Sequence, residues 1–481
     1  MTPQDYACLD GIAIADLIRA GEVSPAEVMA AAREAIARFN PPINAVIETY
    51  DDEPGGLPLT ASASPLAGAP FLFKDVGGVP EGRLSEAGSR LGRGMRAAYD
   101  SSLWRRYRAA GLLPLGRTAS PEFAFNLTTE NLLHGPTRNP WNPDHSAGGS
   151  SGGAAAAVAA GMAPVAEAND GGGSIRIPAS CCGVFGLKPT RGRLSSAPGA
   201  AEYLSGLSQS HVVTRSVRDS AAALDIAAGA EPGDPYVIER PERPFLEEVG
   251  RPVGRPRIAF TTAPWNGASV APVVRAAVEE AARLCEDLGA IVEEARPELG
   301  ISWEAFVHAN AVIWSSHIAA WIDSLSAATG RPIDADHLEH TSLACYRFGA
   351  SRSARDLIGA LYMCNAVSRS VGRFFENYDL LLTPTLPAPP PPLGLFNADD
   401  PDLDALGWTA KIFEGSPFTP LFNVTGQPAM SVPWTRTAEN LPIGVQFAAP
   451  MNGEAMLIRL AAAIEAAHPW DVRIPAYLST S

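Results

Sequence analysis

Two serines and one lysine occur in contexts that suit acyl-transfer chemistry. Ser150 lies in a glycine-rich run at residues 148–153, Ser174 follows three consecutive glycines, and Lys74 follows a short apolar segment. A hydroxyl is a weak nucleophile at neutral pH and needs a base beside it, and a lysine serves as that base only when burial lowers its pKa. Glycines let backbone N–H groups approach a developing oxyanion closely. These residue types together predict an acyl-transfer site that uses no histidine.

Each glycine run taken alone has simpler interpretations. The run Asp170–Ser174 is compatible with a tight turn and, by composition, with a phosphate-binding loop. A P-loop requires the pattern Gly-x-x-x-x-Gly-Lys-Ser/Thr, which the sequence lacks, and three consecutive glycines match a dinucleotide-binding fingerprint poorly. The prediction therefore depends on the two serines and the lysine together.

The eight histidines do not suggest a competing site. The run His337–His340 departs from the His-Glu-x-x-His pattern of zinc proteases, and a charged helix surface explains it better. His317 falls in an expected helix, three residues after Trp314, and is expected to be a packed or surface residue. We predict no metal site and no histidine-based catalytic triad.

Composition and charge restrict the class of protein. The chain has 481 residues, of which 46% are hydrophobic and 19% charged, which is typical of a globular protein. The net charge of −15 and the lack of a basic run argue against nucleic acid as a primary partner. Six scattered cysteines indicate reduced thiols in a reducing cytoplasm. The sequence says nothing about oligomeric state.

Neither a signal peptide nor a membrane span is expected. Residues 1–19 lack a basic segment followed by a continuous apolar core. The most apolar long run, residues 152–166, is short for a membrane span and contains Pro164, so we interpret it as a buried helix. A cytoplasmic location follows from these two features and the cysteines.

Alternating strand and helix patterns predict an α/β fold. Apolar strands are expected at residues 71–73 and 112–115 with a helix between them, and a strand at 257–261 precedes an amphipathic helix at 271–289. Residues from about 303 to 378 read as mostly helical.

The organisation of the chain predicts a single domain over residues 1–481. No internal repeat or clean linker is visible, and the proline-rich run at 386–392 is interpreted as a stiff internal loop rather than a partner-binding motif. Within this domain we expect a core at about 65–230 and a mostly helical subregion at about 300–378.

Taken together, these residues and several further motifs resemble the amidase signature family of serine hydrolases. The similarity covers nearly the whole chain and is least diagnostic between about residues 230 and 380. It is carried by Lys74 and by Pro121–Ala124, Thr129–Asn131, Gly135–Asn142, Gly148–Gly153, Asp170–Ala179, Cys182–Thr190, Thr214–Asp219, Asn423–Pro428 and Leu441–Gln446.

The resemblance implies a fold and a set of roles. The fold would be a mixed, mostly parallel twisted central sheet covered by helices on both faces. Ser174 would be the nucleophile, Ser150 a bridging serine after a cis peptide bond from Gly149, and Lys74 the base. The oxyanion would be held by the N–H groups of Gly171, Gly172, Gly173 and Ser174, and no cofactor would be needed.

Supporting roles and a family branch are also implied. Ser151 would be a supporting hydrogen-bond partner, Asp170 would fix the glycine turn, and Arg176 would make a structural contact. The family usually has Gly-Thr-Asp before the glycine turn, whereas this chain has Ala168-Asn169-Asp170. Together with the segments Ile177–Ser180 and Lys188–Arg193, that pair of Asn and Asp resembles the branch that contains 6-aminohexanoate cyclic-dimer hydrolase.

The substrate class follows from the resemblance only in outline. Phe125, Leu127 and Trp314 are candidates for an acyl pocket, although core packing explains each of them as well. We expect a small apolar or aryl amide, with cyclic amides, esters and carbamates (urethanes) sharing the same acyl-enzyme chemistry. The alternatives are an amidotransferase subunit that generates ammonia from glutamine, and a catalytically silent binding protein on the same fold.

Overall fold

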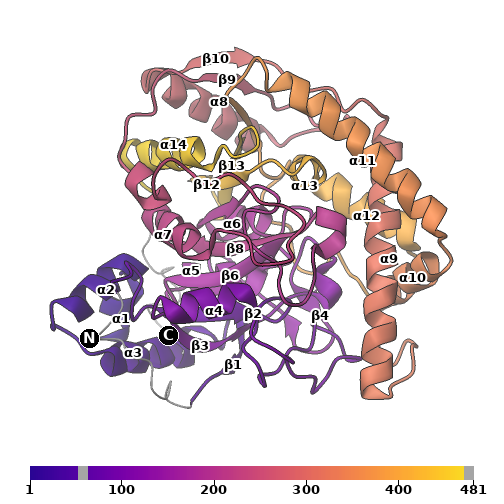
Figure 1. Ribbon diagram of the computed structural model, residues 1–481, viewed down its shortest axis with the longest axis horizontal. Helices are drawn as coiled ribbons and strands as arrows, with labels where there is room; N and C mark the ends of the chain where they lie inside the picture. The colour runs from indigo at the N-terminus through magenta and orange to yellow at the C-terminus, as the bar shows by residue number, and fades with distance from the viewer. Residues whose placement is uncertain (52–62, 471–481) are drawn as a thin grey trace.

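The structure, a computed structural model, is built around one large sheet (Figure 1) and describes residues 1–51 and 63–470. Eleven strands form this sheet. From one edge to the other they are β1 (Val46–Thr49), β3 (Leu113–Thr118), β2 (Pro70–Lys74), β6 (Val165–Asp170), β8 (Gln209–Thr214), β7 (Phe185–Lys188), β12 (Ala429–Arg436), β13 (Pro442–Ala448), β11 (Leu380–Pro384), β9 (Arg257–Phe260) and β10 (Ile291–Glu294). A separate short ladder joins β4 (Glu130–Asn131) to β5 (Gly135–Pro136).

The expected α/β class and mixed central sheet are confirmed, with parallel strands grouped at two places. Strand β2 pairs in parallel with β3 and β6, and β9 pairs in parallel with β10 and β11, whereas the other six described pairs are antiparallel. Parallel neighbours need a crossover connection. Helix α4 (Ser102–Ala109) supplies one between β2 and β3, and α8 (Pro272–Asp287) supplies one between β9 and β10. Four strand pairs of the central sheet are parallel and six are antiparallel, so parallel pairs are fewer than the family resemblance led us to expect.

Both faces of the sheet are covered by helices. Phe71 and Phe73 of β2 pack into one apolar cluster, while Leu72 between them packs into another, as the alternation of a strand requires. The first cluster includes α4, α8, α7 (Val217–Ala227) and α14 (Glu454–Ala467). The second includes α1 (Pro3–Ala7), α2 (Gly11–Arg19), α3 (Pro25–Phe39), α5 (Gly152–Ala159) and α6 (Arg176–Cys182).

A third apolar cluster contains the helical subregion predicted from the sequence. Its long helices are α9 (Trp303–Thr329), α10 (His340–Ala350) and α11 (Ala354–Phe374), joined by α12 (Ala405–Gly415) and α13 (Pro420–Thr425). Helix α9 begins where the Ser302 side chain accepts a hydrogen bond from the Ala305 N–H, and ends at Gly330 in the left-handed conformation. Figure 1 shows α9 and α11 standing at the edge of the molecule, beside α12 and α13.

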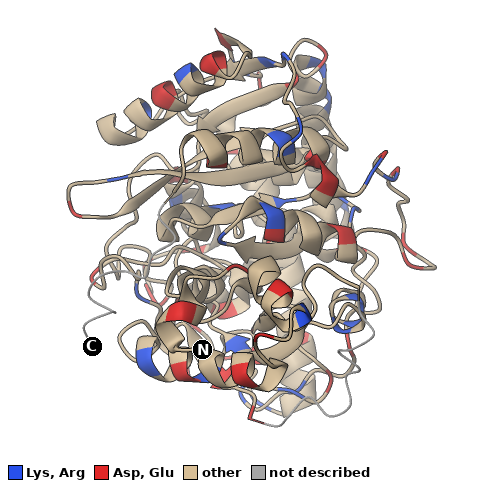
Figure 2. Ribbon diagram, turned by 90° about the vertical axis from the view of Figure 1, so that its left-hand side faces the viewer, with Lys and Arg blue, Asp and Glu red and all other residues tan. Residues whose placement is uncertain are grey.

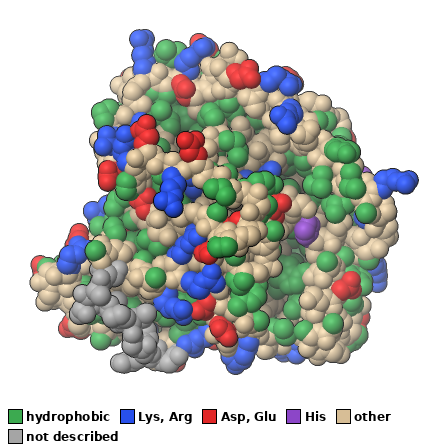
Figure 3. Space-filling view, in the orientation of Figure 1, with side chains coloured by type: hydrophobic (Ala, Val, Ile, Leu, Met, Phe, Trp, Pro, Cys, Tyr) green, Lys and Arg blue, Asp and Glu red, His purple; other side chains and the backbone are tan. Residues whose placement is uncertain are grey.

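Charged residues of both signs are interspersed along the ribbon in Figure 2, and the face drawn in Figure 3 likewise carries scattered acidic and basic residues. On the face drawn in Figure 3, acidic residues lie among the basic ones and no continuous basic surface is seen. Among the described residues, no helix combines the length and the apolar character needed to cross a membrane.

Candidate active site

Lys74 occupies the carboxyl end of β2 and is completely buried. Its Nζ donates hydrogen bonds to Ser150 Oγ at 2.7 Å and to Asn169 Oδ1 at 2.6 Å. Burial lowers the pKa of Lys74 to about 7, although the nearby carboxyl groups of Glu167, Asp170 and Asp75 act in the opposite direction. A large fraction of this lysine is therefore neutral near physiological pH and can accept a proton.

Ser150 is held at the entry to α5 by a tightly packed backbone. The peptide bond from Gly149 to Ser150 is cis, as the resemblance implied. A Cβ on Gly149 would lie 2.5 Å from the carbonyl oxygen of Thr128, so only glycine fits there. The hydroxyl of the neighbouring Thr129 donates to the carbonyl of Gly148 at 2.9 Å. These contacts fix the segment that presents the Ser150 hydroxyl to Lys74.

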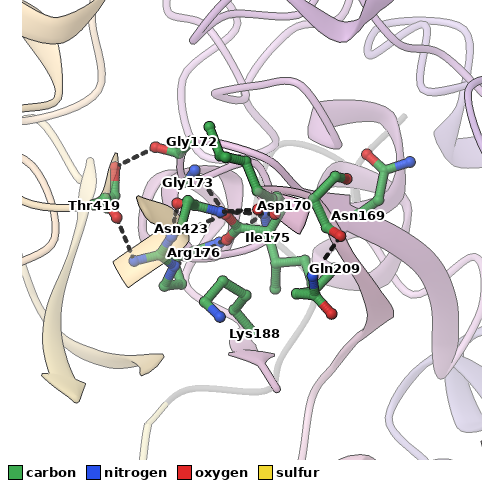
Figure 4. Close-up of polar contacts among 12 residues, drawn as sticks. Asn169, Asp170, Gly172, Gly173, Ile175, Arg176, Lys188, Gln209, Thr419 and Asn423 are labelled. Carbon is green, nitrogen blue, oxygen red and sulfur yellow. Dashed lines mark hydrogen bonds and ion pairs between the residues drawn. The ribbon is translucent and has the colours of Figure 1, made fainter. Parts of the chain in front are cut away.

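The glycine turn after β6 is organised around the carboxylate of Asp170, which is buried (Figure 4). This carboxylate accepts hydrogen bonds from the N–H of Gly173 at 2.7 Å and from the N–H of Ile175 at 3.2 Å. Arg176 donates to it through Nε at 2.9 Å and through a terminal nitrogen at 2.8 Å. The Arg176 guanidinium keeps the pKa of Asp170 at about 2 despite the effect of burial, so the carboxylate stays ionised.

Three residues from the C-terminal part of the chain also hydrogen-bond to this turn and to Arg176. Asn423 donates through its side-chain amide to the Asp170 carboxylate and to its backbone carbonyl, both at 2.8 Å. Thr419 donates through its hydroxyl to the carbonyl of Gly172 at 2.7 Å. Gln446 accepts from Arg176 at 2.7 Å. Asn423 and Gln446 lie in segments that carried the family resemblance, but without a role, whereas nothing in the sequence singled out Thr419.

Replacing Asp170 by asparagine tests how strongly this buried pair stabilises the fold. Arg176 is completely buried and would lose its only ion-pair partner among the described residues. We expect the free energy of unfolding to fall by about 3–5 kcal/mol, measured by urea denaturation. The control is Asp16→Asn, which removes an exposed pair with Arg19 and should cost less than about 1 kcal/mol. Equal losses for the two variants would contradict this assignment.

Ser174 lies directly after the glycine turn and is 7% exposed. Its carbonyl accepts a hydrogen bond from the N–H of Ser151 at 3.3 Å, so the two serine-bearing segments are in direct contact. Ser151 also donates through its hydroxyl to the carbonyl of Asn169 at 3.3 Å. The structure thus brings Lys74, Ser150 and Ser174 together around the end of β6, although they are distant in sequence.

The three candidate pocket residues are all buried, and one of them, Trp314, lies beside the glycine turn. A Cβ on Gly171 would lie 2.8 Å from the Trp314 ring. Phe125 stacks on that ring, with centroids 4.5 Å apart and planes inclined by 15°. Leu127 instead faces Gly415 at the end of α12, where an added Cβ would lie 2.7 Å from its Cδ2. Trp314 Nε1 is buried and has no hydrogen-bond partner within the described ranges.

A second lysine, Lys188 at the end of β7, is also completely buried. Burial lowers its pKa to about 7, with a smaller contribution from the positive charge of Arg176. Its Nζ donates to the carbonyl of Pro189 at 2.8 Å rather than to a serine. Figure 4 shows Lys188 below the pair of Asp170 and Arg176. The two lysines therefore differ in position rather than in basicity.

The helix-surface interpretation of the run His337–His340 is wrong, because only His340 belongs to α10 and Glu339 is buried in the turn before that helix. His337 contacts Asp334 and His340 contacts Asp399, each at 2.8 Å and in partly exposed positions. His317 is hydrogen-bonded to the Ser205 hydroxyl at 2.9 Å, and burial lowers its pKa. Within residues 1–51 and 63–470, no group of three or more His, Cys, Asp or Glu side chains could hold a metal ion.

This fold and site geometry define a class of protein. Residues 27–458 match the model of the amidase family, and the chain belongs to that family, the amidase signature hydrolases. The 6-aminohexanoate-cyclic-dimer hydrolase of Paenarthrobacter ureafaciens is 37% identical, over 98% of this chain and 97% of its own. The expected resemblance to that branch is confirmed.

Solved structures agree with this assignment. A 6-aminohexanoate cyclic dimer hydrolase complexed with substrate superposes with a TM-score of 0.93 at 35% identity, covering 98% of this chain and 99% of that one. A bacterial aryl acylamidase gives a TM-score of 0.86 at 28% identity, covering 97% and 98%. A glutamyl-tRNA(Gln) amidotransferase subunit of Thermotoga maritima gives 0.76 at 27%, covering 99% and 97%. The chain is therefore an amide hydrolase of this family.

Proposed function

We propose that this amide hydrolase cleaves small apolar or aryl amides through an acyl-enzyme, with Ser174 as nucleophile, Ser150 as proton relay and Lys74 as base. The observation that supports this most directly is the 2.7 Å contact between Lys74 Nζ and Ser150 Oγ. A buried lysine with a pKa near 7 that contacts a serine hydroxyl has the basicity that general-base catalysis requires.

Acylation begins when Ser174 Oγ attacks the carbonyl carbon of the substrate. As the new C–O bond forms, the proton of Ser174 passes to Ser150 Oγ, and the proton of Ser150 passes to neutral Lys74. The electron pair of the carbonyl bond moves to its oxygen, which becomes an oxyanion. Because the N–H of Gly173 already donates to Asp170, we assign the oxyanion to the N–H groups of Gly171, Gly172 and Ser174. One such donor contributes about 2.7–4 kcal/mol to transition-state stabilisation.

The relay then runs in reverse to release the amine. Protonated Lys74 returns a proton through Ser150 to the leaving nitrogen, the carbon–nitrogen bond breaks, and the acyl group stays on Ser174 as an ester. A water molecule, deprotonated by the same relay, attacks this ester and releases a carboxylic acid. Esters and carbamates enter at the same step because they also form an acyl-enzyme, so we propose urethanase and esterase activity as side reactions.

The pH dependence follows from the lowered pKa of Lys74. The base must be neutral to accept a proton, and it is neutral above its pKa of about 7. We expect kcat/KM to rise with pH and to level off above an inflection near 7, because this parameter reports the free enzyme. A profile of anilide hydrolysis from pH 5 to 9 measures it. A flat profile over this range would contradict neutral Lys74 as the base.

Trp314 is proposed to contribute to substrate selection. The benzene edge of its indole lies beside Gly171. Its buried N–H, which has no partner among the described residues, can donate to a hydrogen-bond acceptor in the acyl part of the substrate. We expect Trp314→Phe to keep the stacking on Phe125 but to raise KM about 3- to 10-fold for substrates with such an acceptor. Purely aliphatic anilides should be unaffected. The control is Trp321→Phe in the same helix, whose ring packs on Phe123.

The substrate class is tested with the purified chain and a panel of 4-nitroanilides, aryl amides, cyclic amides and carbamates. Turnover of the anilides by the chain alone is the expected result. Glutaminase activity that appears only after the other components of an amidotransferase are added would instead support the amidotransferase alternative, which rests on the weaker similarity to the Thermotoga maritima protein.

A further inference from the structure

A cavity of about 330 Å³ lies outside the serine–lysine cluster, between helix α11, helix α13 and the turn η3 (Tyr203–Gly206). Three kinds of side chain line it. Arg191 and Arg369 are cationic, Ser205, Asn365 and Thr425 are polar, and Leu207, Leu361 and Val424 are apolar. Lys74, Ser150 and Ser174 are not part of its lining.

The cavity is cationic although the protein is acidic. Both charged residues that line it are arginines, and no aspartate or glutamate lines it, in a chain with a net charge of −15. Arg191 is held in place because it donates to the carbonyls of Gly206 at 2.7 Å, Asn423 at 2.7 Å and Val424 at 2.9 Å. Carbonyls do not neutralise its charge. Glu202 favours the charged form of Arg191 against the lowering of its pKa by burial, and it lines a neighbouring cavity that Arg191 lines as well.

Thr425 provides an independent indication that a ligand occupies this cavity. It is 9% exposed, and its Oγ1 has no hydrogen-bond partner among the described residues. An unpaired buried hydroxyl costs free energy that a bound acceptor recovers. Thr425 and the two arginines line the same cavity, and an oxyanion accepts hydrogen bonds from hydroxyl and guanidinium groups.

The cavity is separated from the glycine turn by a wall of two residues. Leu204 and Ser205 both have left-handed φ values, 52° and 51°, which bulky residues seldom adopt. The Leu204 side chain points at the glycine turn, since a Cβ on Gly171 would lie 2.9 Å from its Cδ1. Ser205 lines the cavity on the other side, and its hydroxyl is tied to His317 at 2.9 Å. Leu204 and Ser205 therefore lie between the glycine turn and the cavity.

We propose that this cavity is a second binding site, for a small monocarboxylate with a short apolar chain. The carboxylate is held by Arg191, Arg369 and Thr425, and the chain lies against Leu207, Leu361 and Val424. Because the lining excludes Ser174, the proposal does not rest on the catalytic assignment. A carboxylate is favoured over inorganic phosphate because three of the lining residues offer apolar surface.

Calorimetric titration of the full chain with butyrate, at constant ionic strength, tests this site. We expect saturable binding to the wild type and at least about tenfold weaker binding to Arg369→Gln, because a charge-assisted hydrogen bond is lost. Asn365→Asp, which adds a negative charge to the lining, should weaken binding similarly. The matched control is Arg373→Gln, one helical turn further along α11 and outside the lining, which should bind like the wild type.

Two further measurements distinguish binding at this cavity from binding at the serine–lysine cluster. Ser174→Ala should bind butyrate as the wild type does, and Arg369→Gln should keep kcat/KM for anilides within about twofold, so that binding at the triad is not mistaken for this site. No saturable binding to the wild type, or unchanged binding in both Arg369→Gln and Asn365→Asp, would overturn the proposal. Inorganic phosphate that binds as tightly as butyrate would overturn the assignment to a carboxylate with an apolar chain.

Discussion

Replacing Ser174 by alanine is expected to lower kcat for every amide substrate by about 10⁶-fold, the loss found when the nucleophile of a serine protease is removed. Alanine lacks the oxygen that forms the acyl-enzyme, so neither the base nor the oxyanion donors can compensate. The side chain is only 7% exposed and small, and its loss leaves the contact between the Ser174 carbonyl and Ser151 intact. We therefore expect the fold and the thermal midpoint to be nearly unchanged.

Ser180→Ala is the matched control for this substitution. Ser180 is a buried serine in the same helix region, and its hydroxyl accepts a hydrogen bond from the Gly444 N–H at 2.9 Å, away from Lys74. Its loss should affect stability by about 1 kcal/mol and leave kcat largely unchanged. Equal activity of Ser174→Ala and wild type, in preparations free of contaminating amidase, would show that another residue is the nucleophile.

Replacing Lys74 by methionine is expected to lower kcat/KM by about 10²- to 10⁴-fold, the usual contribution of a general base. Methionine fills the buried space with a flexible apolar side chain but cannot accept the proton that Ser150 releases. It also removes the bonds to Ser150 and Asn169. Steady-state kinetics with one anilide measures the effect, and circular dichroism checks that the fold is retained.

Lys188→Met separates this role from a general effect of buried lysines. Lys188 is as buried as Lys74, and burial lowers its pKa to the same value of about 7, but it contacts the Pro189 carbonyl. Loss of that hydrogen bond should change kcat/KM by less than about tenfold. If the two methionine variants lost equal activity, proton transfer through Lys74 would no longer explain the loss.

The parts of the site that could be predicted from the sequence are those with a local signal. Ser150 and Ser174 lie in glycine runs that are rare in composition, and Lys74 follows a buried strand. The stretch at about 303–378 was also expected to be mostly helical, and α9, α10 and α11 lie in it. The same patterns predicted several elements, such as β2, α4 and α8, but not the strands β6, β7 and β8.

The remaining parts depend on contacts between distant segments. Thr419 reaches the carbonyl of Gly172 across 247 positions, and threonine is too common to draw attention on its own. Asn169 was noticed as a departure from the family pattern, but its bond to Lys74 was not predicted. Antiparallel pairing in the central sheet is also mostly non-local, whereas β12 and β13 are joined by a short turn at residues 437–441.

The central claim is that Ser174 is an activated nucleophile, and intact-mass spectrometry after treatment with a fluorophosphonate tests it most directly. We expect a single covalent adduct on the wild type, none on Ser174→Ala, and slower labelling of Lys74→Met because its base is missing. An adduct that persists on Ser174→Ala, or a wild type that stays unlabelled while it hydrolyses anilides, would contradict the account.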